Sequence, residues 1–461
     1  MNVSKWAAAA AMGAGLLACG GGEGNPPAPG GETPAAIAIS VPGRYIIKLA
    51  ANGGSSWVAL AEKARRFENT TTPDRQLLLS AEGGRVQLQA YTPPDGWSLI
   101  DFTLHPSREI SVVLASDHRL RLQRLSATGT LLRDQEFLDP PAATDPIING
   151  PFALMNSQSL LPLVTRDAAR LGAIGEDLVL GFRSGRFAVV LHRLAYSADA
   201  GFAKRWRSLV EPGVLIGASL PMSGSFDPFK SVDHMWRLAL EVDTQGRIAI
   251  ALSLTHTELV AGHAEHFGEA LDRSVTDGFL LSRFSAEGQR LYSVLKNTGQ
   301  RAEVHGLRWI GERIAVVGRT RSVQTPEGWN GFVALLSDAS RTLNYELIDV
   351  DQGEVLFDIA ALPGGRLLAT GAAGYTQNPT GASISEAASP LLVQLADDGK
   401  LLKHIPLARG PRHNQLRAAL AWQNGWLLGS MDNGPGTHSA DGDAAQLTAD
   451  GQLREQRQLD L

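Results

Sequence analysis

Three histidines in one segment of the chain have the chemistry of metal ligands. His256, His263 and His266 stand within residues 255–276, together with Glu258 and Glu265. Imidazole nitrogens and carboxylate oxygens are donors that zinc and similar ions accept. The pair His263 and His266 would share one face of a helix, although it lacks the His-Glu-x-x-His spacing of metalloproteases. A solvated surface insertion accounts for the same residues, so the segment predicts a candidate metal site with a structural alternative.

Two tryptophans are candidates for contact with a ligand or partner. Trp97 follows Pro93-Pro94-Asp95-Gly96, and Trp329 lies in Pro326-Glu327-Gly328-Trp329-Asn330-Gly331, which predicts a loop around each. Exposed aromatic side chains in loops anchor carbohydrates and protein partners. A structural role in packing is the alternative for each of them.

Acidic turns and missing motifs narrow the chemistry further. The stretches 349–354 and 432–443 are rich in acidic residues and Asn, whose oxygens could bind calcium. Neither stretch has the ligand spacing of a calcium loop, so ordinary polar turns are the alternative. The chain has no Gly-x-Ser-x-Gly elbow, no phosphate-binding Gly-x-x-x-x-Gly-Lys loop and no Cys-x-x-Cys-His motif. We therefore predict no recognisable catalytic machinery, while catalytic residues scattered over several loops stay compatible with the sequence.

Cys19 is the only cysteine of the chain. It has no partner for an intramolecular disulfide and no second thiol for a metal or redox site. It ends an apolar, Ala-rich run, Trp6 to Ala18, that Lys5 precedes. The chemistry left to such a cysteine is attachment of a lipid.

This N-terminal segment resembles a bacterial lipoprotein signal peptide with its lipobox, Leu16-Leu17-Ala18-Cys19. The resemblance implies that residues 1–18 are removed and that Cys19 becomes the acylated first residue. Gly20 stands where an Asp often signals retention in the inner membrane, so the resemblance favours the outer membrane. An ordinary secretory signal peptide that contains a cysteine is the alternative.

The composition of the remaining chain predicts a tether followed by one folded domain. Residues 19–39 form a tether, rich in Gly and Pro up to residue 35, and residues 40–461 would form the folded domain. Hydrophobic residues make up 44% and charged residues 19% of the chain, as in globular proteins. The net charge is −5 without a basic stripe, which argues against nucleic acid as a partner.

A repeated hairpin runs through the domain. An apolar run, a short turn ending in Gly and a second strand of mixed polarity recur, most clearly around Ser126–Gly129, Ser285–Gly288 and Ala396–Gly399. Gly supplies the positive φ that a tight turn needs. A second unit precedes the later copies of this hairpin. It consists of an apolar strand, a short turn and a very apolar strand, as at Gly306–Gly318 and Asp358–Gly371. Continuous apolar character predicts strands covered on both faces.

Together the two units give four strands, of which the inner ones are buried and the outermost one is polar. This arrangement is typical of a β-propeller blade. The pattern resembles the loosely defined cell-surface and quinoprotein-like propeller repeats of bacterial envelope proteins. We predict an all-β fold, a propeller of seven four-stranded blades, with six or eight also compatible. The blades would span roughly 40–92, 95–138, 160–208, 212–297, 302–349, 355–408 and 416–461, with Tyr45–Leu49 as a candidate closing strand. Two β-sandwich domains divided near 140–155 are the alternative fold.

Two functions follow as hypotheses. The first is a lipid-anchored binding or scaffold propeller of the bacterial cell envelope, whose partner is an envelope protein or a carbohydrate. The second is a periplasmic polysaccharide hydrolase or lyase with its active site on the central propeller face. We expect no cofactor apart from the covalent lipid on Cys19, or a metal at the histidines if they bind one. Acidic, basic and imidazole groups converging at the centre would favour the enzyme.

Overall fold

The computed structural model describes the greater part of the domain. The described residues are 38–41, 44–53, 56–63, 74–80, 89–116, 119–139, 169–184, 188–211, 214–216, 238–254, 257–259, 278–299, 302–321, 328–350, 353–361, 365–374, 389–406, 413–422, 425–433, 440–448 and 458–459. All regular elements among them are β-strands. None of these ranges contains a helix long and apolar enough to span a membrane.

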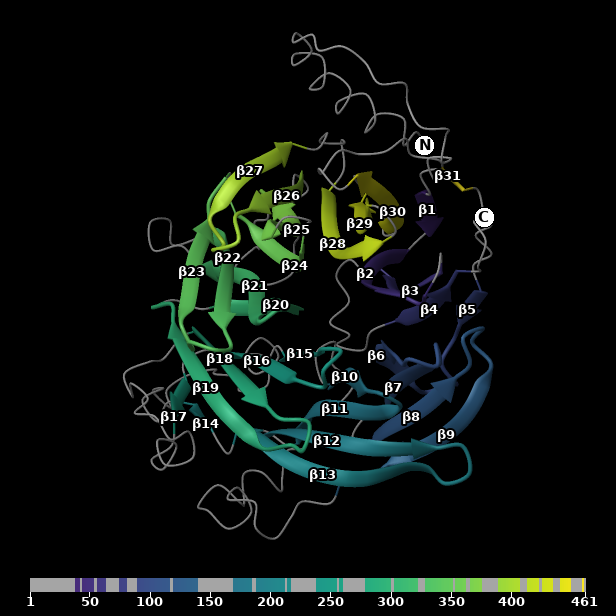
Figure 1. Cartoon of the computed structure of the whole chain (residues 1–461). Coiled ribbons are helices and arrows are strands. Elements are labelled where there is room, and N and C mark those ends of the chain that lie inside the picture. Colours follow the sequence, from purple (N-terminus) through teal and green to yellow (C-terminus); the bar gives the residue numbers. More distant parts are fainter. Residues whose placement is uncertain are drawn as a thin grey trace, which may run out of the picture.

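Six four-stranded sheets follow one another in chain order around a ring (Figure 1). The first two are β2(Arg44–Ala51), β3(Trp57–Lys63), β4(Arg75–Leu79), β5(Gln89–Tyr91), and β6(Ser98–Leu104), β7(Ile110–Ser116), β8(Arg119–Leu125), β9(Leu131–Phe137). The next two are β10(Ala169–Ile174), β11(Asp177–Ser184), β12(Ala188–Ser197), β13(Gly201–Glu211), and β15(Leu238–Val242), β16(Ile248–Leu254), β18(Gly278–Phe284), β19(Arg290–Asn297). The last two are β20(Ala302–Ile310), β21(Arg313–Arg321), β22(Trp329–Ser337), β23(Leu343–Ile348), and β24(Val355–Ala361), β25(Leu367–Ala373), β26(Ser389–Leu395), β27(Leu401–Pro406).

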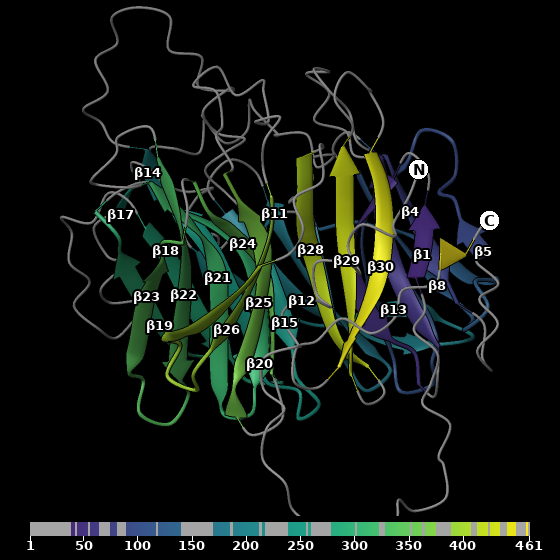
Figure 2. The same ribbon diagram turned by 90° about the horizontal axis from the view of Figure 1, so that it is seen from above.

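A five-stranded sheet completes the ring between the sixth sheet and the first. Its order is β28(His413–Trp422), β29(Gly425–Asn433), β30(Ala440–Thr448), β1(Ala38–Val41) and β31(Gln458–Leu459). Figure 2 shows β28, β29 and β30 side by side, with β1 next to them. A separate pair, β14(Val214–Ile216) and β17(Thr257–Leu259), joins segments that precede and interrupt the fourth sheet.

This architecture is a β-propeller, and the prediction of an all-β propeller with four-stranded blades is confirmed. Its blades are the six four-stranded sheets, which is one of the numbers compatible with the sequence and one fewer than the preferred seven. The five-stranded closing sheet carries the last repeat. The predicted closing strand was wrong. Tyr45–Leu49 lies in β2, the innermost strand of the first blade, whereas Ala38–Val41 pairs antiparallel with β30. The closing strand thus comes from just before the first blade.

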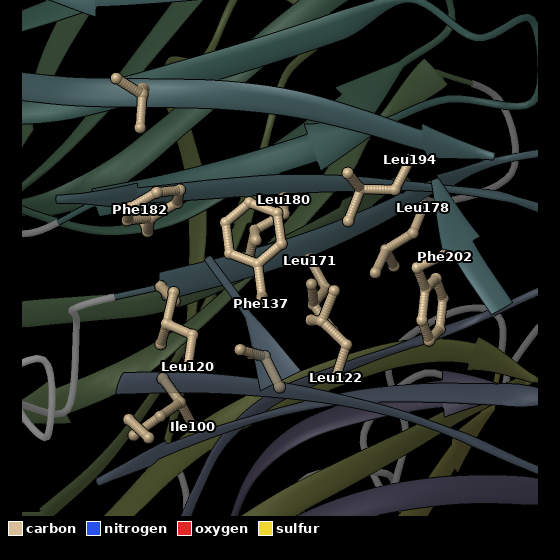
Figure 3. Packing of buried hydrophobic residues seen from close by; sticks show 14 residues of the cluster. Ile100, Leu120, Leu122, Phe137, Leu171, Leu178, Leu180, Phe182, Leu194 and Phe202 are labelled. Atoms are coloured by element: carbon tan, nitrogen blue, oxygen red, sulfur yellow. The ribbon is translucent and has the colours of Figure 1, made fainter. Parts of the chain in front are cut away.

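The core lies between the blades. In Figure 3, Ile100, Leu120 and Leu122 of the second blade face Leu171 and Leu180 of the third, with Phe137 among them. Each other pair of neighbouring blades has a similar apolar cluster. Every fully buried Leu in such a layer stabilises the fold by about 2 kcal/mol. Sheets that pack on both faces explain why β25 is buried along its whole length.

The repeated turns have the predicted geometry. Ser285 donates its N–H to the carbonyl of Gln289, and Gly288 donates to the carbonyl of Ser285 at 3.0 Å, with a φ of +81° at Gly288. The Ser126 and Ala396 turns repeat this pattern of backbone bonds. The carbonyl of Ala286 then accepts hydrogen bonds from Arg193 and Trp206 of the preceding blade. The turn therefore also locks one blade to the next.

Candidate functional site in the central channel

The innermost strands of the six blades and of the closing sheet, seven in all, carry a recurring irregularity. Five of them have a register shift against their neighbour, which leaves one extra residue on the inner strand. The extra residues are Ile47 in β2, Ile100 in β6, His305 in β20, Phe357 in β24 and Arg417 in β28. A bulge bends the strand and turns a side chain out of the sheet. All five bulged residues line one cavity at the centre of the ring.

This central channel has a volume of about 120 Å³ and is lined from all seven inner strands. One water requires roughly 10–15 Å³ of such space, so the channel has room for several waters or one small molecule. Its walls contain five cations and three carboxylates among the described residues. They are Lys48, Arg75, Arg170, Arg308, Arg417, Asp101, Glu241 and Asp358.

Charges of opposite sign alternate around the channel. Each inner strand contributes one charge, in the order Lys48 (β2), Asp101 (β6), Arg170 (β10), Glu241 (β15), Arg308 (β20), Asp358 (β24) and Arg417 (β28). We call these seven residues the charge ring. An odd number of members cannot alternate completely, so two successive members, Arg417 and Lys48, are both cations and lie on the adjacent strands β28 and β2.

Ion pairs connect the first strands of the charge ring. The Nζ of Lys48 lies 2.7 Å from Oδ1 of Asp101 and also donates to the carbonyl of Phe102. The other oxygen of Asp101 accepts the backbone N–H of Leu171 at 2.9 Å. A single carboxylate in β6 thus binds both neighbouring inner strands.

A second carboxylate repeats this arrangement. The guanidinium of Arg308 makes a bidentate pair with Asp358, with Nε to Oδ1 and Nη2 to Oδ2 both 3.0 Å. Oδ2 of Asp358 also accepts the N–H of Ala419 in the next inner strand, at 3.0 Å, and Oδ1 accepts the N–H of Ile359. In both cases the acidic residue stabilises the strand order around the axis.

Glu241 is held less tightly. Its nearer oxygen lies 3.4 Å from Nη1 of Arg308, and 28% of its side chain is exposed. Burial raises the pKa of Glu241 above its usual value, although Arg308 and Lys48 oppose the shift. The pKa of Arg308 is raised in turn, chiefly by Asp358.

Arg417 and His305 stand on bulges beside aromatic and acidic groups. The guanidinium carbon of Arg417 is 4.0 Å from the ring centre of Phe357, and its Nε donates to Gln415 at 2.7 Å. The imidazole of His305 meets the same Phe357 ring edge-on, with 5.1 Å between centroids. Arg75, which also lines the channel, is paired with the buried Glu62 at 2.7 Å.

The residues predicted from the sequence lie elsewhere. Cys19, His256, His263 and His266 fall outside the described residues. Trp97 is half-buried before β6, with the guanidinium groups of Arg119 and Arg121 over its ring. Trp329 is not in a loop, because it begins β22, is 8% exposed and stacks with Arg319 at 4.1 Å.

The acidic turn at 349–354 has a structural explanation. Glu354 is buried, and its carboxylate accepts the N–H of Val350. Across the described ranges, no three His, Cys, Asp or Glu residues are placed to hold a metal ion.

Sequence reasoning missed the charge ring, although a signal was present. Asp101 stands in Leu99-Ile100-Asp101-Phe102, and Asp358 in Leu356-Phe357-Asp358-Ile359. An acidic residue at the same place in two otherwise apolar inner strands is unusual, because burying a carboxylate requires partners. The repeat could have identified both as a pair of equivalent positions.

Comparison with known proteins finds distant structural similarity and no family for this chain. No protein-family model and no curated protein matches the chain. Among solved structures, YCF48 bound to D1 peptide is similar at 9% identity and a TM-score of 0.46, covering 91% of this chain and 97% of that one. A virginiamycin B lyase from Staphylococcus aureus with quinupristin is similar at 9% identity and a TM-score of 0.44, covering 88% of this chain and 99% of that one. Sqt1 from Chaetomium thermophilum is similar at 9% identity and a TM-score of 0.44, covering 90% of this chain and 98% of that one. The class that the sheet order defines is the β-propeller.

Proposed function

We propose that this chain is a lipid-anchored binding propeller of the bacterial cell envelope, attached through acylated Cys19 after removal of residues 1–18. The anchor rests on the lipobox-like sequence and on the Gly/Pro-rich tether. By the same resemblance, the outer membrane is its favoured location. The partner would be an envelope protein or a carbohydrate, or a small molecule of the envelope.

Acidic, basic and imidazole groups do converge in the channel, as expected for the enzyme, but the state of the two buried carboxylates favours binding over catalysis. Both oxygens of Asp101 and both oxygens of Asp358 accept hydrogen bonds or ion pairs from neighbouring strands. A carboxylate that is fully occupied in this way is a poor general acid or base, because a proton donor or acceptor must face the reacting group. A rigid, charged wall is suited to holding a ligand.

The position of the first described strand fits this function. β1, the first described strand, lies beyond β30, three strands away from the channel-lining β28. Figure 1 places β1 and β31 at the rim of the ring. A tether that leaves from the rim keeps the centre free.

The anchor is tested on the full-length chain in a bacterial host that processes lipoproteins. We expect the wild-type protein in the membrane fraction, with a mature N-terminal peptide whose mass corresponds to acylated Cys19. Cys19→Ser should appear in the soluble fraction without the acyl mass. An unmodified Cys19 in the wild type, or a Cys19→Ser variant that stays with the lipid, would contradict the anchor.

A polysaccharide hydrolase or lyase acting at the central face is the second candidate. It is favoured by the convergence of Glu241 and His305 in one cavity and by the raised pKa of Glu241, which suits a general acid. The test is incubation with a panel of acidic and neutral polysaccharides, followed by assay of new reducing or unsaturated ends. Cleavage by the wild type that Glu241→Gln abolishes would replace the binding proposal by this one.

A further inference from the structure

Glu241 stands apart from the other two carboxylates of the channel wall. Asp101, Asp358 and Ala239 occupy equivalent places, since each pairs with the fourth residue of the second strand of its sheet. Both aspartates accept a backbone N–H from the next inner strand, at 2.9 and 3.0 Å. On β15 the carboxylate comes two residues later, at Glu241, and no backbone N–H within the described ranges donates to it. Glu241 therefore does not bind the backbone of the neighbouring strand as the two aspartates do.

The contacts of Glu241 leave most of its hydrogen-bonding capacity to a ligand. Its two oxygens lie 3.4 and 3.5 Å from the same Nη1 of Arg308. Charge-assisted hydrogen bonds are usually about 2.7–2.9 Å long, and a carboxylate can accept about four hydrogen bonds. Arg308 makes its closer, bidentate pair with Asp358, at 3.0 Å. Of the three described carboxylates that line the channel, Glu241 is thus the one that can accept donors from a bound molecule.

The surroundings of Glu241 favour a neutral donor over a cation. Burial raises the pKa of Glu241, and Arg308 and Lys48 both oppose that shift. These two cations already act on the carboxylate, so an ammonium group that entered beside it would be repelled by both. A hydroxyl group donates a hydrogen bond without adding charge. Two hydroxyl groups on adjacent carbons can reach the two oxygens of one carboxylate together.

The rest of the wall fits the carbon frame of a polyol. Ala239 and Leu240 of β15 and Leu307 of β20 line the same channel as Glu241. The C–H groups of a ligand can pack against these apolar side chains. The channel volume of about 120 Å³ has room for several waters. A polyol between glycerol and a monosaccharide in size presents a similar number of oxygen atoms in one molecule.

We propose that the central channel binds a small neutral polyol of three to about six carbons, which donates two adjacent hydroxyl groups to the carboxylate of Glu241. Its C–H groups lie against Ala239 and Leu307. The proposal rests on the proposed binding function, for which it names the ligand class, but not on the lipid anchor. A free polyol or sugar and the end of an envelope oligosaccharide present the same hydroxyl groups, and the channel volume favours the free molecule.

Isothermal titration calorimetry of the full-length Cys19→Ser chain tests the site. The probes are glycerol, erythritol, D-glucose, maltotriose and ethanolamine at constant ionic strength. We expect saturable one-to-one binding of glycerol, erythritol or glucose, with maltotriose and ethanolamine bound more weakly. Saturable binding of none of the first three probes, or tighter binding of maltotriose or of ethanolamine, would overturn the proposal.

Two substitutions at Glu241 locate the ligand. Glu241→Gln removes the charge and leaves one acceptor oxygen, so it should weaken binding of the best polyol by at least about tenfold. Glu241→Asp keeps the charge but draws the carboxylate back by one methylene group, so it should weaken binding severalfold. Glu287→Gln is the matched control, because Glu287 is exposed in the turn between β18 and β19 of the same sheet. Thermal unfolding establishes that each variant is folded before titration, and Glu241→Asp carries the test if Glu241→Gln does not fold.

Equal affinity of Glu241→Gln and Glu287→Gln for the polyol, or undiminished affinity in Glu241→Asp, would contradict this position of the hydroxyl groups. A failure of the site with Cys19 acylated in the wild type removes the channel ligand and leaves the anchored propeller. Polyol binding by a chain that is not acylated removes the anchor and leaves the site.

Discussion

Arg308 and Asp358 lie on the inner strands of neighbouring blades and face each other as a bidentate ion pair, with both N–O distances 3.0 Å. Because Asp358 also accepts the N–H of Ala419, one carboxylate joins three successive inner strands. The ion pair therefore stabilises the ring and also forms part of the channel wall.

Removing the charge of Asp358 should destabilise the fold. Asp358→Asn leaves the Arg308 guanidinium without its main counter-charge in a site where the carboxylate is only 8% exposed. We expect a loss of about 2 kcal/mol in the free energy of unfolding, measured with urea. Asp398→Asn removes a carboxylate from an exposed turn pair with Lys400 and should leave the unfolding midpoint unchanged. Equal midpoints for the two variants would mean that the pair contributes nothing to the ring.

His105 should make the protein acid-sensitive. It lies between two blades, where Nδ1 is 3.0 Å from the carbonyl oxygen of Gly175 and Nε2 is 2.9 Å from Oγ of Ser111. As the carbonyl can only accept, the neutral ring donates from Nδ1 and accepts from Ser111. Burial, reinforced by the charge of Arg124, lowers its pKa from 6.5 to about 4, against the opposing effects of Glu176 and Asp177.

The sign of the effect follows from this lowered pKa. The folded chain binds fewer protons than the unfolded chain, so the stabilisation is complete above pH 6.5 and is lost as the pH falls towards about 4. The loss amounts to about 3 kcal/mol. Urea unfolding across this range should show it in the wild type, and His105→Asn should have a flatter profile. Parallel profiles for the two proteins would refute the assignment.

Gly288 should tolerate no side chain. Its φ is +81°, and a Cβ there would lie 2.5 Å from the Trp206 ring of the preceding blade. Gly288→Ala should therefore cost about 2–3 kcal/mol, from backbone strain plus the collision. Gly311→Ala is the control, since Gly311 has a φ of +61° and open space around it. It should show the backbone cost of about 1 kcal/mol alone. Similar losses of stability in both variants would show that Trp206 moves aside without an energetic cost.

The ring should depend on β1. Deleting residues 1–41 removes the strand that pairs with β30 at Ile39, Ser40 and Val41, whereas deleting residues 1–36 keeps it. Loss of β1 exposes the edge of β30 and releases the closing sheet, so the first deletion should melt several degrees lower. Equal melting temperatures would indicate that closure does not need this strand.

The repeating units could be predicted from the sequence because they depend on local chemistry. Gly129, Gly288 and Gly399 occupy turns with positive φ, as their position directly after a Thr, Glu or Asp between two strands predicted. The apolar run Leu367–Ala369 is buried on both faces. Both patterns are determined by neighbouring residues in the chain.

Ring closure and the channel could not be predicted in the same way. Edge pairing uses backbone groups that every residue carries, so nothing in Ala38–Val41 distinguishes it from Tyr45–Leu49 as a partner for β30. The charge ring includes Lys48 and Arg417, which are far apart in the sequence and line one channel only because the ring closes. Single charges in separate repeats acquire a common role only when the blades are placed around an axis.

Mass spectrometry of the full-length chain from a bacterial host that processes lipoproteins tests the central claim, that this propeller is anchored through Cys19. We predict that the chain in the membrane fraction has an N-terminal peptide that begins at Cys19 and carries the acyl mass. A wild-type chain recovered only from the soluble fraction, with Cys19 unmodified, would contradict the account.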